Sequence, residues 1–179
     1  MACDITSGYT LGCRDNTGGI KNVYILSGSV AGLTGEDVGL ITEISGSGTF
    51  YKYELTRQTG DYTETINASL ENGTVFYEQV VNAPFHKMES TLRKKIKILE
   101  KNPALKIIVE TNNGEDATAG KFFYLGQQNG LSLSGGSGAT GTAFGDMNGY
   151  TLTFTGQEPL PASEVTAPLA SSLTGIAVG

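Results

Sequence analysis

One stretch of the chain carries apolar residues at helical spacing. These residues, three or four positions apart, are Phe85, Met88, Leu92, Ile96 and Leu99. That spacing places them on one face of a helix. Pro84 suits the first helical turn, and Asn102 precedes a proline, which disfavours helical backbone angles. The pattern therefore predicts one amphipathic α-helix over residues 84–101.

Around this helix the pattern is that of β-strands, with alternating or continuous apolar residues between turn signals. The sequence predicts strands at residues 20–26, 40–44, 49–56, 62–70, 74–81, 105–111, 121–125, 131–134 and 150–155. It predicts a turn at residues 45–48 and loops at residues 27–39 and 135–149. A lone helix with one apolar stripe has to cover a sheet. The expected fold is thus mainly β, a sandwich or partly closed barrel of about nine strands with one flanking amphipathic α-helix.

The expected domain organisation is one central unit with an arm at each end. At 179 residues the chain suffices for one domain with a full core. Residues 1–19 are broken by glycines and predict an N-terminal arm, and residues 20–156 form a single β-sandwich domain. Residues 157–179 hold three of the five prolines and many small residues, which predicts an extended C-terminal arm.

Charge is unevenly distributed along the chain. The net charge of −6 argues against an electrostatic grip on nucleic acid. Residues 85–101 hold six basic and two acidic residues, a net of +4, so the rest of the chain carries −10. A candidate basic outer face of the helix consists of Lys87, Arg93, Lys94, Lys97 and Lys101. Such a face is either solvated or a binding patch.

The sequence predicts no catalytic, metal or cofactor site. His86 is the single histidine, so a catalytic triad or a metal site would have to be built around it. Its place beside Phe85 in the first turn of the predicted helix favours a surface or capping histidine over a general base. Cys3 and Cys13 lack the spacing of a zinc site. The glycine-rich run at residues 134–141 lacks the lysine of a phosphate-binding loop. No stretch approaches the run of about 18 apolar residues that predicts a membrane span.

These features favour a structural protein that assembles with copies of itself. Many strands leave sheet edges that have to be covered or paired. Arms at both ends are expected to find partners outside their own domain. The candidate subunit contacts are apolar residues of the arms and long loops, namely Tyr9, Leu11, Leu33, Val38, Phe144, Met147, Leu160, Val165 and Leu169.

Two parts of the chain resemble virion structural proteins of tailed bacteriophages. The first is the run from Gly12 to Lys21 (GCRDNTGGIK) followed by Val23-Tyr-Ile25. The second begins with KFFYLG at residues 121–126 and continues through residues 128–130, 135–136, 141–142 and 145–146 to GYTLTFTG at residues 149–156. Within that group the chain looks most like a tail tube, or major tail, protein.

The resemblance implies a β-sandwich whose copies join into rings, typically hexameric, that stack into a hollow tube conducting genomic DNA. The implied partners are further copies of the chain and other phage tail proteins, with transient passage of DNA and no membrane. The implied location is the virion tail, assembled in the bacterial cytoplasm. An acidic chain fits a channel that must not retain phosphates. Two alternatives stay open: another virion component, such as a head decoration, tail terminator or neck protein, and a ligand-binding β-sandwich.

Overall fold

The structure, a computed structural model, describes residues 8–10, 16–35, 39–113 and 121–179. Within these residues the chain forms eleven strands, one α-helix and one short 3-10 helix. In chain order they are β1 (Ile20–Thr34), β2 (Leu40–Ile41), β3 (Glu43–Glu54), β4 (Asp61–Ser69), β5 (Thr74–His86), α1 (Ser90–Leu99), β6 (Ile107–Thr111), β7 (Phe122–Leu125), β8 (Ser132–Ala139), β9 (Gly149–Glu158), β10 (Ser163–Val165), η2 (Leu169–Ser172) and β11 (Leu173–Val178). The predicted fold class, mainly β with one flanking helix, is confirmed.

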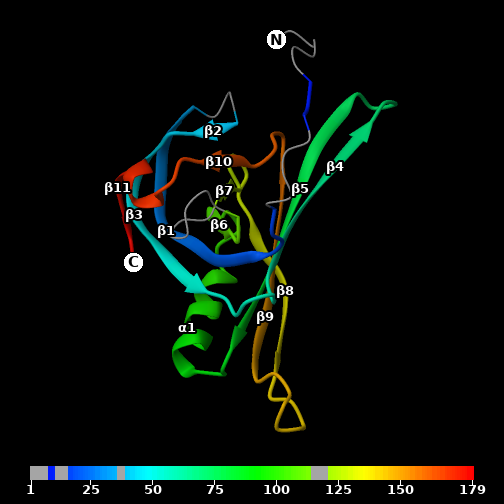
Figure 1. Cartoon of the computed structure of the whole chain (residues 1–179), viewed down its shortest axis with the longest axis vertical. Helices are drawn as coiled ribbons and strands as arrows, with labels where there is room; N and C mark the ends of the chain where they lie inside the picture. Colours follow the sequence, from blue (N-terminus) through cyan, green and yellow to red (C-terminus); the bar gives the residue numbers. More distant parts are fainter. Residues whose placement is uncertain (1–7, 11–15, 36–38, 114–120) are drawn as a thin grey trace.

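The strands form two sheets. Seven strands make the larger sheet in the order β11-β3-β1-β6-β7-β10-β2, and four make the smaller one in the order β4-β5-β9-β8. The larger sheet curls into a partly closed barrel, and the smaller one lies beside it along the longest axis of the molecule (Figure 1). β2 pairs with β10, and after Thr42 the same stretch of chain continues into β3, which pairs with β1 and β11. The segment of residues 40–54 thus links β2, at one edge of the curled sheet, to β3, which lies next to the opposite edge strand β11.

Two apolar cores hold these layers together. One core lies between the two sheets and under α1, and its largest buried members include Phe85, Ile107, Leu125, Leu131 and Phe154. The other core fills the barrel. It contains Tyr24, Leu26, Ile41, Ile44, Phe50, Ile108, Phe122, Tyr124, Val165, Leu169 and Ile176. The strands β1, β6 and β7 contribute to both cores because alternate residues of a strand face opposite sides of a sheet.

The predicted loop at residues 27–39 and the predicted turn at residues 45–48 are largely wrong. β1 runs on to Thr34 and β3 spans residues 43–54 without a turn, and the two strands pair along their whole glycine-rich part. Gly28 lies opposite Gly48, and a Cβ on Gly28 would stand 2.1 Å from the Ser47 carbonyl oxygen. The glycines therefore permit a close approach between bent strands. In the sequence, glycines with this role cannot be told apart from glycines that form a turn.

The helix is shorter than predicted. It spans Ser90–Leu99 instead of residues 84–101, because residues 84–86 continue β5 and pair with β9. Pro84 is tolerated there since β4 pairs with β5 only as far as Asn82, which leaves Pro84 with a partner strand on one side. Lys87, with a φ of 73°, separates the strand from the helix. Leu92, Ile96 and Leu99 do face the core as expected.

The expectation of an extended arm at residues 157–179 is wrong. β10 pairs with β7 and β2, and β11 pairs in parallel with β3. Val165, Leu169 and Ile176 of this segment are buried in the barrel core. The prolines misled the prediction because they bend the chain between short strands instead of keeping it extended. At the other end of the chain, the described residues 8–10 and 16–18 precede the first strand and are exposed, and the rest of the predicted N-terminal arm lies outside the described residues.

Candidate assembly surfaces

The outer face of the four-stranded sheet is mainly polar and carries two carboxylates, Asp61 and Glu78. Residues that alternate with the core-facing positions point away from the barrel, and in register they form rows across the sheet. One such row joins Asp61, Asn82 and Thr153, where the Asn82 Nδ2 donates to the Asp61 carboxylate at 3.0 Å and the Thr153 hydroxyl donates to the Asn82 Oδ1 at 3.0 Å. Hydroxyl and amide groups dominate the other rows.

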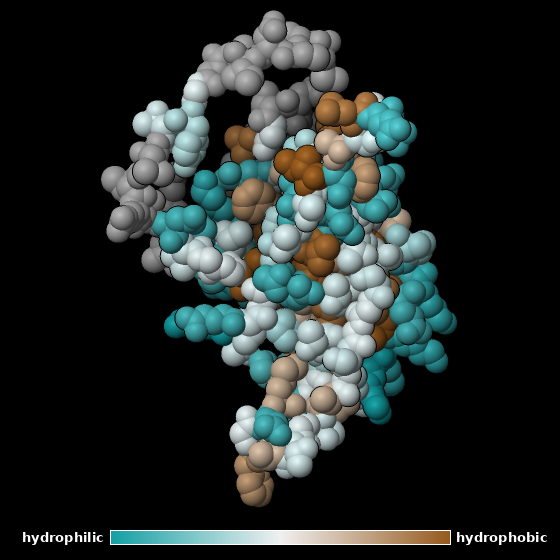
Figure 2. Space-filling model, turned by 90° about the vertical axis from the view of Figure 1, so that its right-hand side faces the viewer, coloured by the Kyte–Doolittle hydropathy of each residue, from teal (hydrophilic) through white to brown (hydrophobic). Residues whose placement is uncertain are grey.

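The four strands of this sheet, each described in full, contain no lysine and no arginine. Figure 2 views the molecule from the side on which this sheet lies, and its middle is mainly pale to hydrophilic. The outward positions are Asp61, Thr63, Thr65, Asn67 and Ser69 from β4, Thr74, Phe76, Glu78, Val80, Asn82, Pro84 and His86 from β5, Thr151, Thr153, Thr155 and Gln157 from β9, and Ser132 and Ser137 from β8. A surface without lysine or arginine lacks the side chains that bind phosphates electrostatically in most proteins.

Both edges of this sheet, β4 and β8, lack a neighbouring strand within the described chain. β8 is exposed from Ser134 to Ala139 and consists there of small residues, so that no bulky side chain covers its edge. β4 is exposed at most of its positions. An uncovered edge presents unpaired N–H and C=O groups and is a template for pairing with another chain.

The loop between β8 and β9 forms an ordered, apolar tip. Phe144 is fully exposed there, and Met147 is 37% exposed. The Asp146 carboxylate accepts hydrogen bonds from the backbone N–H groups of Thr142 and Ala143, both at 2.8 Å, and these bonds lower its pKa. The tip is therefore braced by its own hydrogen bonds while its aromatic residue faces solvent.

The hairpin of β4 and β5 ends in a second apolar tip. We call residues Ile66, Leu70, Glu71 and Val75 the β4–β5 tip. Leu70 is fully exposed, and Ile66 and Val75 are more than half exposed. Figure 1 places this hairpin end and the β8–β9 tip at opposite ends of the longest axis, and hydrophobic atoms gather near both ends in Figure 2. Large exposed apolar residues at a protruding end mark a contact surface.

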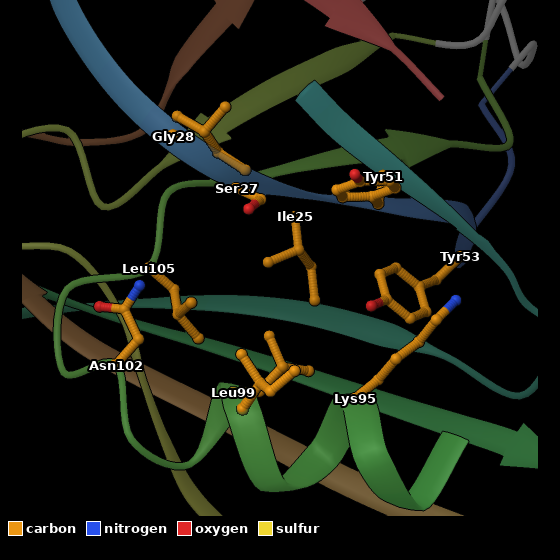
Figure 3. Close-up of a pocket in the computed structure, with 11 residues that line it drawn as sticks. Ile25, Ser27, Gly28, Tyr51, Tyr53, Lys95, Leu99, Asn102 and Leu105 are labelled. Atoms are coloured by element: carbon orange, nitrogen blue, oxygen red, sulfur yellow. The ribbon is translucent and has the colours of Figure 1, made fainter. Parts of the chain in front are cut away.

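A groove of about 470 Å³ lies between α1 and the strands β1 and β3. We call it the α1 groove. Figure 3 shows Lys95 and Leu99 of the helix directed toward Tyr53 and Ile25 of the strands. The Lys95 ammonium lies 5.3 Å from the centre of the Tyr53 ring, and burial raises the pKa of the Tyr53 hydroxyl. The walls thus combine aromatic and aliphatic surface with one cation.

The structure divides the predicted subunit contacts into three groups. Tyr9, Phe144, Met147 and Leu160 are exposed, so they are free to meet another subunit. Leu33 is partly buried against the barrel core, whereas Val165 and Leu169 are buried in that core. The expectation that Val165 and Leu169 form subunit contacts is therefore wrong, because they stabilise their own domain. Leu11 and Val38 lie outside the described residues.

Sequence reasoning missed the β4–β5 tip and the exposed Ile98 of α1. The signal for the tip was present, since Leu70 stands directly before the Glu71-Asn72-Gly73 turn, where its own hairpin does not cover it. All five residues of the predicted basic outer face are exposed: Lys87, Arg93, Lys94, Lys97 and Lys101. Arg93 also donates from its Nε to the Tyr150 hydroxyl at 2.7 Å, which ties α1 to β9.

A buried carboxylate connects the smaller sheet to a turn of the larger one. Glu158, 1% exposed, accepts hydrogen bonds from the backbone N–H groups of Gln128, Asn129 and Gly130 at 2.8 to 2.9 Å. The Lys106 ammonium donates to three backbone carbonyls of the same turn, and burial lowers its pKa, opposed by the charge of Glu158. Each charge is satisfied by backbone groups, which is the arrangement of a structural brace.

A second buried carboxylate, Glu110, lies at the end of β6. It accepts hydrogen bonds from Asn22 Nδ2 at 2.6 Å and from the Tyr24 hydroxyl at 2.9 Å, and Lys21 lies 3.5 Å away. Burial alone would raise the pKa of this carboxyl, but the hydrogen bonds from Asn22 and Tyr24 and the charge of Lys21 outweigh burial and lower it. Burial, together with the hydrogen bond to Glu110 and its charge, raises the pKa of the Tyr24 hydroxyl. The hydrogen bonds of Asn22 and Tyr24 to Glu110 join β1 to β6.

The described residues contain no cluster of three or more histidine, cysteine, aspartate or glutamate side chains that could hold a metal ion. His86 is exposed at the end of β5. No helix in the described part of the chain is long and apolar enough to cross a membrane. Comparisons of the chain with protein-family models, curated proteins and solved structures found no match.

Proposed function

We propose that this protein is the subunit of a bacteriophage tail tube, which assembles into stacked rings, hexameric by the resemblance described above, and conducts DNA. The observation that carries the proposal is the four-stranded sheet, which is open at both edges and has no lysine or arginine on any strand. Open edges supply a way to join copies, and the polar face supplies a surface that does not hold phosphates.

The strand order supports lateral joining of this sheet. All three pairings within the sheet are antiparallel, so β4 and β8 run in opposite directions. When copies are related by rotation about a common axis, β8 of one copy meets β4 of the next in antiparallel orientation. The pattern therefore continues around a ring without interruption, and no edge remains in the closed ring.

The stagger of the strands supports closure into a barrel. The first residues of β5, Thr74–Phe76, pair with β4 alone, and the last residues, 83–86, pair with β9 alone. The two hairpins therefore project in opposite directions (Figure 1). A closed barrel requires such an offset between successive strands, which tilts them relative to its axis. Six copies would contribute about 24 strands, and at about 4.8 Å per strand and a tilt near 40° the backbone ring is roughly 45–50 Å across, which accommodates a DNA duplex.

Electron microscopy over a concentration series tests the proposal. We expect rings or hollow tubes of uniform diameter from the wild-type protein. Small discrete particles at every concentration, also in the presence of the other tail proteins, would contradict the tube and favour a head decoration, terminator or neck protein.

A pair of proline variants tests the edge. Successive N–H groups of a strand point to opposite sides, so one of Ser137→Pro and Gly138→Pro removes a bond to β9 and the other removes an outward donor of β8. The variant that retains the wild-type melting temperature is expected to form no rings. Rings of wild-type diameter from that variant would refute lateral pairing through β8.

A further inference from the structure

The α1 groove is lined by apolar and aromatic side chains, a few polar groups and one cation, Lys95. Its inner wall is formed by the buried side chains of Ile25, Leu99 and Leu105. At its mouth stand Ile98, 69% exposed, and Tyr51, 48% exposed. Lys95 lines the groove, and the exposed lysines 94, 97 and 101 lie outside it, on the same helix or just after its end. A fitting occupant presents aliphatic side chains together with negative charge.

The β4–β5 tip has both properties. Leu70 is fully exposed and Ile66 and Val75 are more than half exposed, while Glu71 is the exposed residue next to Leu70. The tip is a tight hairpin turn, with the Asn72 N–H donating to the Ser69 hydroxyl at 3.3 Å and a φ of 63° at Gly73. A preformed apolar protrusion loses little conformational entropy on binding, which suits it as an anchor.

The hairpin and the helix belong to segments of opposite net charge. Residues 61–85, which contain the β4–β5 hairpin, have four acidic and no basic residues. Residues 85–101, which contain α1, have a net charge of +4. Opposite charges steer two surfaces together and disfavour contacts between like surfaces, here hairpin with hairpin or helix with helix.

We propose that the β4–β5 tip of one copy docks in the α1 groove of a second copy and forms the stacking contact between rings. The hairpin end lies at the top of the longest axis and α1 in the lower half of the molecule (Figure 1). A copy therefore cannot satisfy its own groove with its own tip, and the contact joins different patches. Such a heterologous contact generates a filament when its repetition does not close into a ring, as in a stack of rings. This inference rests on the proposed tube function and names its axial contact.

Charge reversal with internal rescue tests the contact. Three variants are compared with the wild type: Glu71→Lys at the tip, Lys95→Glu in the groove, and the double variant. Both sites are exposed. The single variants change the net charge in opposite directions, and the double variant keeps the wild-type value of −6. Circular dichroism and the melting temperature establish that each variant is folded. Tube length and ring diameter are then measured by electron microscopy.

We expect each single variant to form rings of normal diameter but tubes at least ten-fold shorter, and the double variant to restore tube length. Leu70→Ser is expected to shorten tubes with its charge unchanged. Wild-type tube lengths in both single variants, loss of rings in them, or no restoration in the double variant would overturn the stacking contact while leaving the tube function intact. A wild type that forms neither rings nor tubes would overturn both.

Discussion

Leu169→Ala is expected to destabilise the whole domain, although the residue lies close to the C-terminus. Leu169 is 4% exposed and packs in the barrel core with Val165 and Ile176. Removal of a buried leucine side chain loses its transfer free energy and leaves a cavity, at a cost of about 2–5 kcal/mol. Domains of this kind are stable by about 5–15 kcal/mol, so a large fraction of the folding free energy is at stake.

Urea unfolding followed by far-UV circular dichroism measures this loss. With a slope of about 2 kcal/mol per M, the midpoint is expected to fall by roughly 1–2.5 M. Val178→Ala is the matched control, because Val178 belongs to the same terminal segment but is 42% exposed. Its free energy of unfolding is expected to change by less than about 0.5 kcal/mol. Equal midpoints for the two variants would refute the placement of Leu169 in the core.

Deletion of residues 159–179 extends the same reasoning. It removes Val165, Leu169 and Ile176 together with the pairing of β10 and β11. The loss of Leu169 and Ile176 costs about 2–5 kcal/mol each, and the loss of Val165 adds to this cost. Together these losses are comparable to the whole stability of a typical domain, about 5–15 kcal/mol. The truncated chain is expected to be unfolded. A cooperative unfolding transition with the wild-type spectrum would show instead that the segment is a dispensable arm.

Three further predictions concern single residues and are read by denaturant unfolding. Glu158→Ala is expected to cost at least about 3 kcal/mol, since bonds to a charged group contribute about 1.5–3 kcal/mol each, whereas Gln157→Ala at the exposed neighbouring position is expected to be nearly neutral. Gly28→Ala is expected to cost at least about 1–3 kcal/mol, because Gly28 has a φ of 150° and a Cβ there would clash with β3. Gly135→Ala is the control, because the space around Gly135 is open. Because the pKa of Glu110 is lowered in the folded chain, its carboxyl binds more protons in the unfolded chain between this lowered pKa and about pH 4.5. Stability therefore falls as pH falls through the folded pKa, and Glu110→Gln is expected to flatten that dependence. An unchanged pH profile in Glu110→Gln would contradict this account.

The sequence by itself determined the class of fold and the sign of the charge on α1 and on the four-stranded sheet. Alternation of apolar and polar residues is a local property, and it placed strands such as residues 74–81 and 150–155 and one helix with Leu92, Ile96 and Leu99 inward. The absence of cations from the four-stranded sheet and the basic character of α1 are likewise present in the sequence, once strands are assigned.

Only the tertiary structure decided how glycine-rich and proline-rich segments are used. Gly28 and Gly48 are 20 positions apart, and they lie opposite each other in paired strands. The predicted loop at residues 27–39 and the predicted turn at residues 45–48 thus become parts of the paired strands β1 and β3 of the barrel. Residues 157–179 pair with strands far earlier in the chain, which buries Val165 and Leu169. The exposure of Leu70 depends on how far β4 and β5 extend past β9. The physical reason is common to all of these: burial is set by partners distant in sequence, and local spacing does not specify which segments become neighbours.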